Sequence, residues 1–364
     1  MKITAVQSIA LDIPFTHGGP PQQLGGQTWK VMSSVLVRVE TDAGLTGYGD
    51  AFAYHCRHAV QAVIDNMIAP LVVGKDAGDI TGLNYELQKA MHLFGRYGVN
   101  IFAMSGLDIA LWDIAGKAAG LPLHRLLGGA ARNTIEGYAS LFHYRDPDVV
   151  AERCQAALDE GFRNIKLHET AEPEVRAARE AIGPDIPLMV DTNCPWTPAQ
   201  ARRAAAKFKP YDLYWLEEPI FPPEDYPELA KLRQDSGVPI AAGENACTSF
   251  DFRNMFSAGA VDYAQPSVTK VGGITEFRKV SALAEGNGVT IMPHSPYFGP
   301  GFLATLHLMA AQAPTGLIEQ FFLSPEATLY GDIIKPKNGK FRVPSSPGLG
   351  ADPDPAVIEY YRVD

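Results

Sequence analysis

Apolar and polar positions change their spacing near residue 130. Before that point three runs alternate with the period of two that is typical of β-strands, at 3–13, 31–40 and 45–49. Three helices are predicted to follow, at 57–70, 80–94 and 98–119. Antiparallel strands followed by helices predict an α+β unit over residues 1–125.

After residue 130 short apolar runs alternate with helical segments such as 148–160, 198–208 and 275–287. Eight of these runs are predicted strands: 135–140, 164–168, 187–191, 214–217, 240–243, 261–267, 289–293 and 316–320. A regular strand–helix repeat predicts a parallel barrel over residues 126–320. The Pro- and Gly-rich chain beyond it cannot form a core by itself, so we expect 321–364 to pack back on the first unit.

The connection between the first two strands, from His17 to Gly26, is rich in glycine and proline. It is long for a simple connection, and this composition predicts a loop without regular structure. We expect the loop to act as a lid over a site.

Three predicted barrel strands end in an acid: Asp191, Glu217 and Glu244. The spacings are 26 and 27 residues, which is close to the length of one strand–helix repeat. In a parallel barrel the carboxyl ends of the strands face one pocket. Three carboxylates that converge there predict a Mg²⁺ site. Glu218 alternates with Glu217 along the strand and is expected to point away from that pocket.

Composition narrows the class of protein. The chain has 364 residues, with 46% hydrophobic and 20% charged residues, as in ordinary globular proteins. A net charge of −10 with no compact basic cluster argues against a nucleic-acid partner. Neither a signal peptide nor a membrane span is expected, and the four cysteines show no metal or disulfide spacing. A cytoplasmic location is the expectation.

Several further motifs fall in a fixed order. They are Ala110-Leu111-Trp112-Asp113-Ile114-Ala115-Gly116-Lys117, Leu126-Leu127-Gly128-Gly129, Lys166-Leu167-His168, Lys270-Val271-Gly272-Gly273, Pro293-His294-Ser295 and Pro347-Gly348-Leu349-Gly350. Together with the three acids, they make the chain resemble the mandelate racemase/muconate-lactonizing branch of the enolase superfamily over nearly its whole length. The resemblance implies a (β/α)₇β barrel with a capping domain. It also implies Mg²⁺ on Asp191, Glu217 and Glu244, and removal of a proton α to a carboxylate to form an enediolate.

Lys166 and His168 are the candidate bases. They are two residues apart on one predicted strand, so their side chains share a face. Lysine needs a lowered pKa to accept a proton, whereas histidine needs less adjustment near neutral pH. The family pattern places the base at the second basic position of the pair, which is His168 here. The sequence leaves both residues open.

His294 ends the seventh predicted strand, and Ser267 stands on the sixth where the racemase pattern has an aspartate. A serine hydroxyl is expected to orient His294 only weakly. We therefore expect His294 to serve as the acid that protonates a leaving hydroxyl, or as a modest second base.

Other residues are expected to contact the substrate or to support the metal ligands. Lys270 follows strand six and would support the acids, and Asn193 and Asn245 would lie just outside the ligand shell. The resemblance assigns Glu319, at the end of strand eight, to the substrate carboxylate. Tyr54 and Arg57 lie in the capping domain, and Arg57 is expected either to clamp a distal carboxylate or to be a solvated helix-start charge.

The predicted function is Mg²⁺-dependent dehydration of an acid sugar or related hydroxy acid. A racemase, epimerase or lactone cycloisomerase uses the same chemistry and remains an alternative. A metal-dependent hydrolase is disfavoured because no His-x-His pair is present. A non-catalytic barrel protein is disfavoured by the intact acid set. The expected partner is a small carboxylate substrate, and neither nucleic acid nor a membrane is expected to bind. A homo-oligomer is expected, because the mixed domains and the long loops leave surface to cover.

Overall fold

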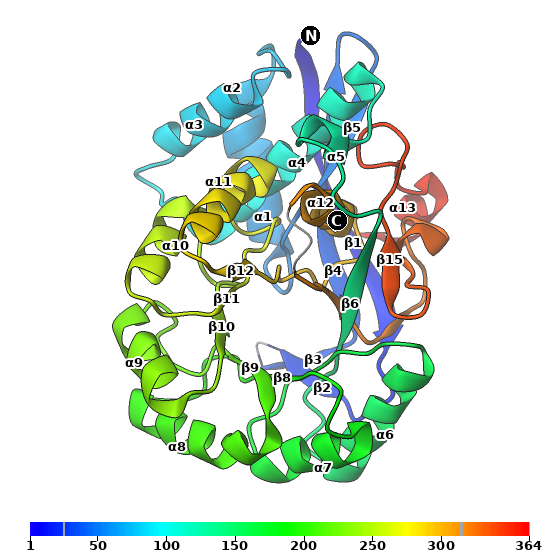
Figure 1. The fold of residues 1–364 in the computed structure, drawn as a ribbon. Coiled ribbons are helices and arrows are strands. Elements are labelled where there is room, and N and C mark those ends of the chain that lie inside the picture. Colours follow the sequence, from blue (N-terminus) through cyan, green and yellow to red (C-terminus); the bar gives the residue numbers. More distant parts are fainter. Residues whose placement is uncertain (25, 313–315, 364) are drawn as a thin grey trace.

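The computed structural model of the protein describes residues 1–24, 26–312 and 316–363. Its larger part is a curled parallel sheet with helices outside it (Figure 1). The strands are β6 (Thr134–Ser140), β7 (Ile165–Leu167), β8 (Leu188–Asp191), β9 (Leu213–Glu217), β10 (Ile240–Ala242), β11 (Tyr263–Ala264), β12 (Thr290–Ile291) and β13 (Ile318–Phe321). They are hydrogen-bonded in that order from β6 to β12, and β13 pairs with β6. The predicted (β/α)₇β barrel is therefore confirmed.

Each barrel helix follows its strand and covers the outer face of the sheet (Figure 1). The helices are α6 (Pro147–Asp159), α7 (Glu172–Ile182), α8 (Pro198–Phe208), α9 (Tyr226–Ser236), α10 (Thr248–Ser257), α11 (Gly273–Gly286) and α12 (Pro300–Ala311). Capping side chains start several of them: Asp146 caps α6, and Thr197 and Gln200 form a capping box on α8. These local signals explain why the helix positions were predictable.

The capping domain contains an antiparallel sheet of β1 (Ile3–Thr16), β4 (Val31–Thr41) and β5 (Thr46–Ala51). Helices cover it: α1 (Arg57–Val63), a π-helical turn at Ile64–Ile68, α2 (Ala69–Val72), α3 (Ile80–Ala90) and α4 (Val99–Ala119). Helix α4 lies so close to β5 that a Cβ added to Gly49 would be 1.8 Å from the carbonyl oxygen of Gly106. Only glycine permits this approach.

The chain beyond the barrel returns to the cap, as expected. Strands β14 (Ser324–Pro325) and β16 (Arg362–Val363) both pair antiparallel with β1. Between them β15 (Lys340–Arg342) pairs with β6. The remaining elements are α5 (Leu123–Leu126), α13 (Pro355–Tyr361) and 3₁₀ turns at Lys209–Tyr211 and Gly331–Ile334. The domain boundaries at 125 and 320 remain predictions.

Asp113 connects the cap to this returning segment. Its Oδ2 accepts from the backbone N–H of Tyr48 at 3.1 Å and from Lys117 Nζ at 2.7 Å. Its Oδ1 accepts from the N–H of Leu349 at 2.8 Å. The carboxylate is 1% exposed, so these three donors compensate for its burial.

Helix α4 is long and apolar enough to cross a membrane by length and composition alone. However, 78% of its apolar window is buried inside the protein, against the cap sheet and α11. It is the core helix of the capping domain.

Two predictions about local structure were wrong. Part of the Gly/Pro-rich connection forms a short hairpin, β2 (Gln22–Leu24) with β3 (Gln27–Trp29), although Gly25 itself lies outside the described residues. The sixth barrel strand is also shorter than predicted, because the chain turns at Ser267, whose carbonyl accepts from the N–H groups of Lys270 and Val271 at 2.9 and 2.8 Å. At the sixth strand, a tight turn takes the place of the extended backbone that the apolar residues had suggested.

Candidate active site

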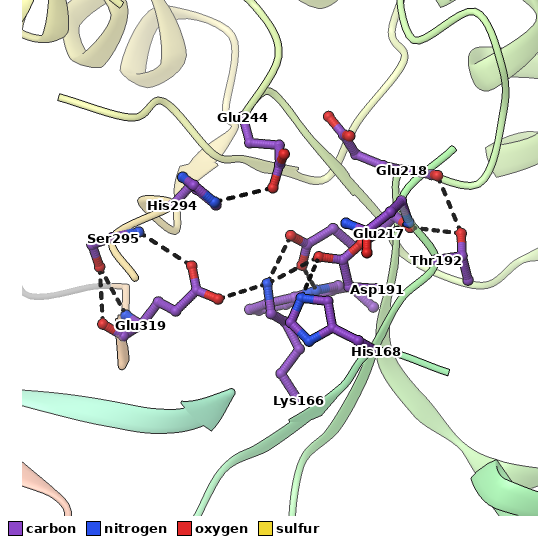
Figure 2. Close-up of polar contacts among 12 residues, drawn as sticks. Lys166, His168, Asp191, Thr192, Glu217, Glu218, Glu244, His294, Ser295 and Glu319 are labelled. Atoms are coloured by element: carbon purple, nitrogen blue, oxygen red, sulfur yellow. Dashed lines mark hydrogen bonds and ion pairs between the residues drawn. The ribbon is translucent and has the colours of Figure 1, made fainter. Parts of the chain in front are cut away.

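The three strand-end acids meet at one edge of the barrel. Asp191 and Glu217 are direct partners in the β8–β9 register, and Glu244 follows β10 by two residues. One oxygen atom from each carboxylate lies within 4.8 Å of the others. Asp191 and Glu217 are fully buried, whereas the Glu244 side chain is 16% exposed and faces the open side of the site. Figure 2 shows the three side chains turned toward a common centre.

Neighbouring groups hold these acids in place. Trp215, two residues before Glu217 on the same face of β9, donates from Nε1 to Glu217 Oε2 at 2.8 Å. Thr192 donates to the carbonyl groups of Glu217 and Glu218, both at 3.1 Å. Asn193 adopts a left-handed φ of 52°, and its backbone N–H donates to Asp191 Oδ1 at 2.9 Å. These contacts support the ligand atoms from outside.

The charge of the site fits a divalent cation. Four carboxylates face it, namely Asp191, Glu217, Glu244 and Glu319, and two ammonium groups, those of Lys166 and Lys270, offset half of that charge. Burial, reinforced by the charge of Asp191, raises the pKa of Glu217 well above its usual value. A cation bound by oxygen ligands would relieve this repulsion, and three carboxylates are a ligand set that Mg²⁺ accepts.

Lys166 lies at the centre of the acids. Its Nζ donates to Glu319 Oε1 at 2.8 Å, to Glu217 Oε1 at 2.9 Å and to Asp191 Oδ2 at 3.2 Å. Burial alone would lower the pKa of Lys166, but the carboxylates, Glu217 first, raise it well above its usual value. In this geometry Lys166 is a fixed positive charge.

His168 lies beside Lys166 and next to Asp191. Its Nδ1 is 2.5 Å from the carbonyl oxygen of Leu141, which can only accept, so the ring carries its proton on Nδ1. This leaves Nε2 toward the site, 3.3 Å from Asp191 Oδ2. Burial would lower the pKa of His168, but the charge of Asp191 raises it above the ordinary value. The two ring nitrogens thus face the Leu141 carbonyl and the Asp191 carboxylate, and Nε2 is the nitrogen on the side of the site.

His294 lies across the site from His168. Its Nε2 is 3.1 Å from Glu244 Oε2, and burial lowers the pKa of His294 to about 3. Ser267, which was expected to orient this ring only weakly, contacts it through a third residue. Tyr297 lies between them: its hydroxyl is 3.0 Å from His294 Nδ1 and also bonds to Ser267 Oγ.

Lys270 and Glu319 each form an ion pair with another charged residue of the site. Lys270 Nζ is 3.7 Å from Glu244 Oε1 and 4.8 Å from the centre of the Phe52 ring. Glu319 accepts from Lys166 on one oxygen and from the N–H of Ser295 at 3.2 Å on the other. Glu218 points away from the centre of the site (Figure 2). Its Oε2 accepts a hydrogen bond from Asn245 Nδ2 at 2.6 Å.

Two residues do not take the positions that were expected of them. The side chain of Asn193 is exposed, so its contribution to Asp191 comes from the backbone. Arg57 NH1 is held at 2.6 Å by Asp12 Oδ2 and is therefore already paired, so the structure does not favour the carboxylate clamp. Tyr54 donates to the carbonyl of Pro296 at 2.6 Å and so steadies the loop that carries His294.

Sequence reasoning missed Leu141 and Trp215, and it did not anticipate the contact of Tyr297 with His294. Trp215 was detectable, because it precedes Glu217 by two residues on the same strand face. Leu141 contacts His168 through its backbone carbonyl. Tyr297 contacts Ser267, which lies 30 residues earlier in the chain. No sequence pattern marks such contacts.

Family comparisons agree with this geometry. Residues 10–128 match the N-terminal domain of mandelate racemase/muconate lactonizing enzymes, and residues 149–357 match the enolase C-terminal domain-like family. The chain belongs to the mandelate racemase/muconate lactonizing enzyme family. As a member of the enolase superfamily it belongs to a group of enzymes that includes dehydratases and cycloisomerases.

Relatives of known name include both reaction types. Arabinonate dehydratase of Saccharolobus solfataricus is 33% identical over 342 residues, which cover 91% of each protein. D-galactarolactone cycloisomerase of Agrobacterium fabrum is 31% identical and covers 100% of this chain and 99% of its own. The family comparison therefore does not by itself choose between elimination and ring isomerisation.

Solved structures show the same architecture. The 3,6-anhydro-D-galactonate cycloisomerase from Zobellia galactanivorans superposes with a TM-score of 0.87 at 30% identity, covering 100% of both chains. A racemase from Streptomyces coelicolor with bound magnesium has a TM-score of 0.88 at 31% identity, covering 99% of this chain and 100% of its own.

Proposed function

We propose that this family member is a Mg²⁺-dependent dehydratase of acid sugars. The observation that carries the proposal is the pair of histidines on opposite sides of the acid triad. His168 Nε2 lies 3.3 Å from Asp191, and His294 Nε2 lies 3.1 Å from Glu244. Elimination of water needs a base for the α-proton and an acid for the leaving hydroxyl, and these rings provide one candidate for each.

Asp191, Glu217 and Glu244 would hold the Mg²⁺ ion, whose charge would stabilise the negative charge that builds on the substrate carboxylate. Lys166 remains protonated in this scheme, since three carboxylates surround it. Its fixed positive charge lies beside the region where that negative charge develops. Glu319, on β13, keeps Lys166 in position from two strands away.

His168 then accepts the α-proton on Nε2, because Leu141 occupies Nδ1. The electron pair of the broken C–H bond forms the enediolate. In its doubly protonated form His294 would give the Nε2 proton to the β-hydroxyl, which leaves as water when the enediolate collapses, and the ring returns to its neutral form. The resulting enol gains a proton to become a 2-keto-3-deoxy acid, and the two histidines exchange protons with solvent before the next turnover. The three carboxylates around Lys166 and the contact of His168 with Leu141 support His168 over Lys166 as the base.

A panel of aldonates tests the proposal, and arabinonate, gluconate, xylonate and rhamnonate are suitable because they are the substrates in the names of relatives. The expected product is a 2-keto-3-deoxy acid, detected as its semicarbazone and by NMR in D₂O. Deuterium at the α-carbon of recovered substrate without keto acid would instead support a racemase or epimerase. Consumption of a lactone to an isomer would support a cycloisomerase. Either result would replace the dehydratase proposal.

Turnover that survives Glu217→Gln would contradict the metal-dependent mechanism altogether. Glu152→Gln is the matched control, because Glu152 is an exposed acid on α6 that pairs only with its neighbour Arg153.

We also propose that the protein is a cytoplasmic homo-oligomer. All four cysteines are free thiols, as expected in a reducing compartment. Large apolar side chains are exposed next to one another on the cap and α10, among them Phe94, Tyr97 and Phe250 at 64%, 52% and 50%. Sedimentation of the protein and of Phe94→Ser would test this, since a monomeric wild-type protein would contradict it.

A further inference from the structure

Four aromatic rings form a continuous arc beside the acid triad. In order of contact, this aromatic arc consists of Phe52, Tyr54, Trp29 and Phe321. Neighbouring rings have centroid distances of 4.8, 5.4 and 5.8 Å. At one end Lys270 Nζ lies 4.8 Å from the Phe52 centroid, and at the other the ring of His168 lies 6.0 Å from that of Phe321. The arc therefore runs from the lysine beside Glu244 to the histidine beside Asp191.

The capping domain provides three of these rings and the barrel provides one. Phe52 and Tyr54 follow β5, Trp29 ends β3, and Phe321 ends β13. Phe321 is 8% exposed, whereas the three cap rings are only partly buried where they pack against the main core. Rings that only fill a core are usually buried on all sides. Part of each cap ring therefore remains open to contact by a ligand.

The arc offers ring surface but no free hydrogen-bond donor. Tyr54 donates its hydroxyl proton to the carbonyl oxygen of Pro296 at 2.6 Å. Trp29 donates from Nε1 to the carbonyl oxygen of Val31 at 2.8 Å. The two phenylalanine rings have no polar atoms. A ligand at the arc thus meets C–H groups and π faces, which favour an apolar group over a polar one.

The cations around the arc are already paired or exposed to water. Lys270 faces Glu244 at 3.7 Å, and Arg57 is held by Asp12. Two further basic residues adjoin the arc in the chain and are exposed, Lys30 and His55. Charges in such positions are screened by solvent and salt. A carboxylate brought to the arc would lose its hydration without gaining a buried partner.

We infer that the aromatic arc is the subsite for the far end of the substrate, and that it selects a sugar acid with a single carboxylate and an apolar end, such as a 6-deoxyhexonate, over a diacid. The inference rests on the proposed function for the position of the carboxylate, which would lie at the acid triad. The carbon chain would extend from there toward the arc. A terminal methyl group would contact the rings, whereas a terminal hydroxyl would gain no donor there.

Three acids of one configuration test this inference, because they differ only at the sixth carbon. They are 6-deoxy-D-gluconate with a methyl group, D-gluconate with a hydroxymethyl group and D-glucarate with a second carboxylate. Calorimetry on the Mg²⁺-saturated His168→Gln protein would measure their Kd values, so that binding is observed without turnover. The corresponding acids of the galactonate configuration would be measured in the same way.

In at least one of the two series we expect the 6-deoxy acid to bind about tenfold more tightly than the hydroxymethyl acid, as for one additional apolar contact in a hydrophobic pocket. The diacid should bind at least about a hundredfold more weakly than the 6-deoxy acid. A diacid that binds as tightly as the two monoacids would overturn the inference. Equal affinity for the deoxy and hydroxymethyl acids in both series, or no binding of any acid, would overturn it as well.

Trp29→Leu removes a central ring of the arc and should reduce the preference for the 6-deoxy acid to about threefold or less. The ratio of two Kd values is the readout, because a general loosening of the fold would weaken all the acids together. An unchanged ratio would contradict the inference. If Trp29→Leu does not fold, Phe52→Leu and the ligand series on the intact arc still decide the matter.

Trp112→Leu is the matched control. Trp112 is also partly buried and also donates from Nε1 to an oxygen, Thr275 Oγ1 at 3.0 Å, but it lies on α4 and is not part of the arc. It should leave the ratio of Kd values unchanged. A loss of preference equal to that in Trp29→Leu would count against the arc as the subsite.

Turnover by the wild-type protein separates this inference from the proposed function. If the 6-deoxy acid binds most tightly but yields no keto acid, only the dehydratase proposal fails. If the protein dehydrates a diacid in preference to the monoacids, only this inference fails.

Discussion

His168 Nδ1 lies 2.5 Å from the carbonyl oxygen of Leu141, a residue 27 positions earlier in the chain. Since a carbonyl only accepts, this contact fixes the tautomer of His168 and directs Nε2 to the substrate side. Lys166, two residues away on the same strand face, is held by three carboxylates. The two candidate bases thus differ in what surrounds them, and this difference makes them separable by experiment.

Replacement of His168 by glutamine should remove the base while it retains a polar side chain. We expect kcat to fall by about 10² to 10⁴, the usual contribution of a general base, and exchange of the α-proton in D₂O to be lost with it. His92→Gln is a control, because His92 is exposed on the cap, away from the acid triad in the sequence, and its Nδ1 contacts the Lys89 carbonyl. If α-proton exchange persists in His168→Gln, the base is elsewhere, and Lys166 becomes the alternative.

Mg²⁺ should stabilise the folded protein through the acid triad. At a free concentration about 100 times Kd, binding is expected to add ~2.7 kcal/mol to the free energy of unfolding. Glu217→Gln should lose this increment. Without metal the variant should be at least as stable as the wild type, because burial and Asp191 raise the pKa of Glu217 and make its charge unfavourable. Thermal melts with Mg²⁺ or EDTA measure both effects, and an undiminished Mg²⁺ shift in Glu217→Gln would contradict the ligand assignment.

Asp113→Ala should destabilise the protein by about 3 kcal/mol or more, since it leaves two buried backbone N–H groups without their acceptor and removes the buried acceptor of Lys117 Nζ. Urea denaturation measures the loss. Asp352→Ala is the matched control, because Asp352 binds the same Lys117 from an exposed position. Its effect should stay below about 1 kcal/mol. Equal losses in the free energy of unfolding would contradict the prediction that the buried hydrogen bonds of Asp113 contribute more to stability than the exposed ion pair of Asp352.

Asp50 should make stability depend on pH. Asp50 is buried on β5 beside the start of α12, where Oδ2 accepts from the N–H of Gly301 at 3.3 Å, and burial raises the pKa of Asp50 to about 7. Between its usual pKa of 3.8 and about 7, the unfolded chain has released a proton that the folded chain still holds. The free energy of unfolding therefore falls as pH rises through this window.

Asp50→Asn should remove this contribution. The variant should match the wild type below pH ~4 and exceed it above pH ~7, by on the order of 4 kcal/mol at most. Part of the pH dependence should remain, because burial also raises the pKa of Asp108 to about 7. Asp185→Asn, at an exposed position, controls for a change in net charge. A stability difference that is the same at every pH would contradict the assignment.

Much of the fold was predictable because its signals are local. The change from a period of two to alternating strands and helices separates the cap from the barrel. The acids at the ends of β8, β9 and β10 identify the site, since parallel strands bring their carboxyl ends to one edge. The hairpin in the first long connection was not predictable, because glycine and proline permit several turn geometries.

The sequence by itself determined which chemical groups reach the barrel mouth: four carboxylates, two lysines and two histidines, each placed by its position at or just beyond a strand end. The tertiary structure decided what each group can do there. Leu141 contacts Nδ1 of His168, Tyr297 contacts Nδ1 of His294, and Asp12 pairs with Arg57 from 45 residues away. These outcomes depend on distances between segments that are remote in the chain, and the spacing of residues along a strand carries no information about them.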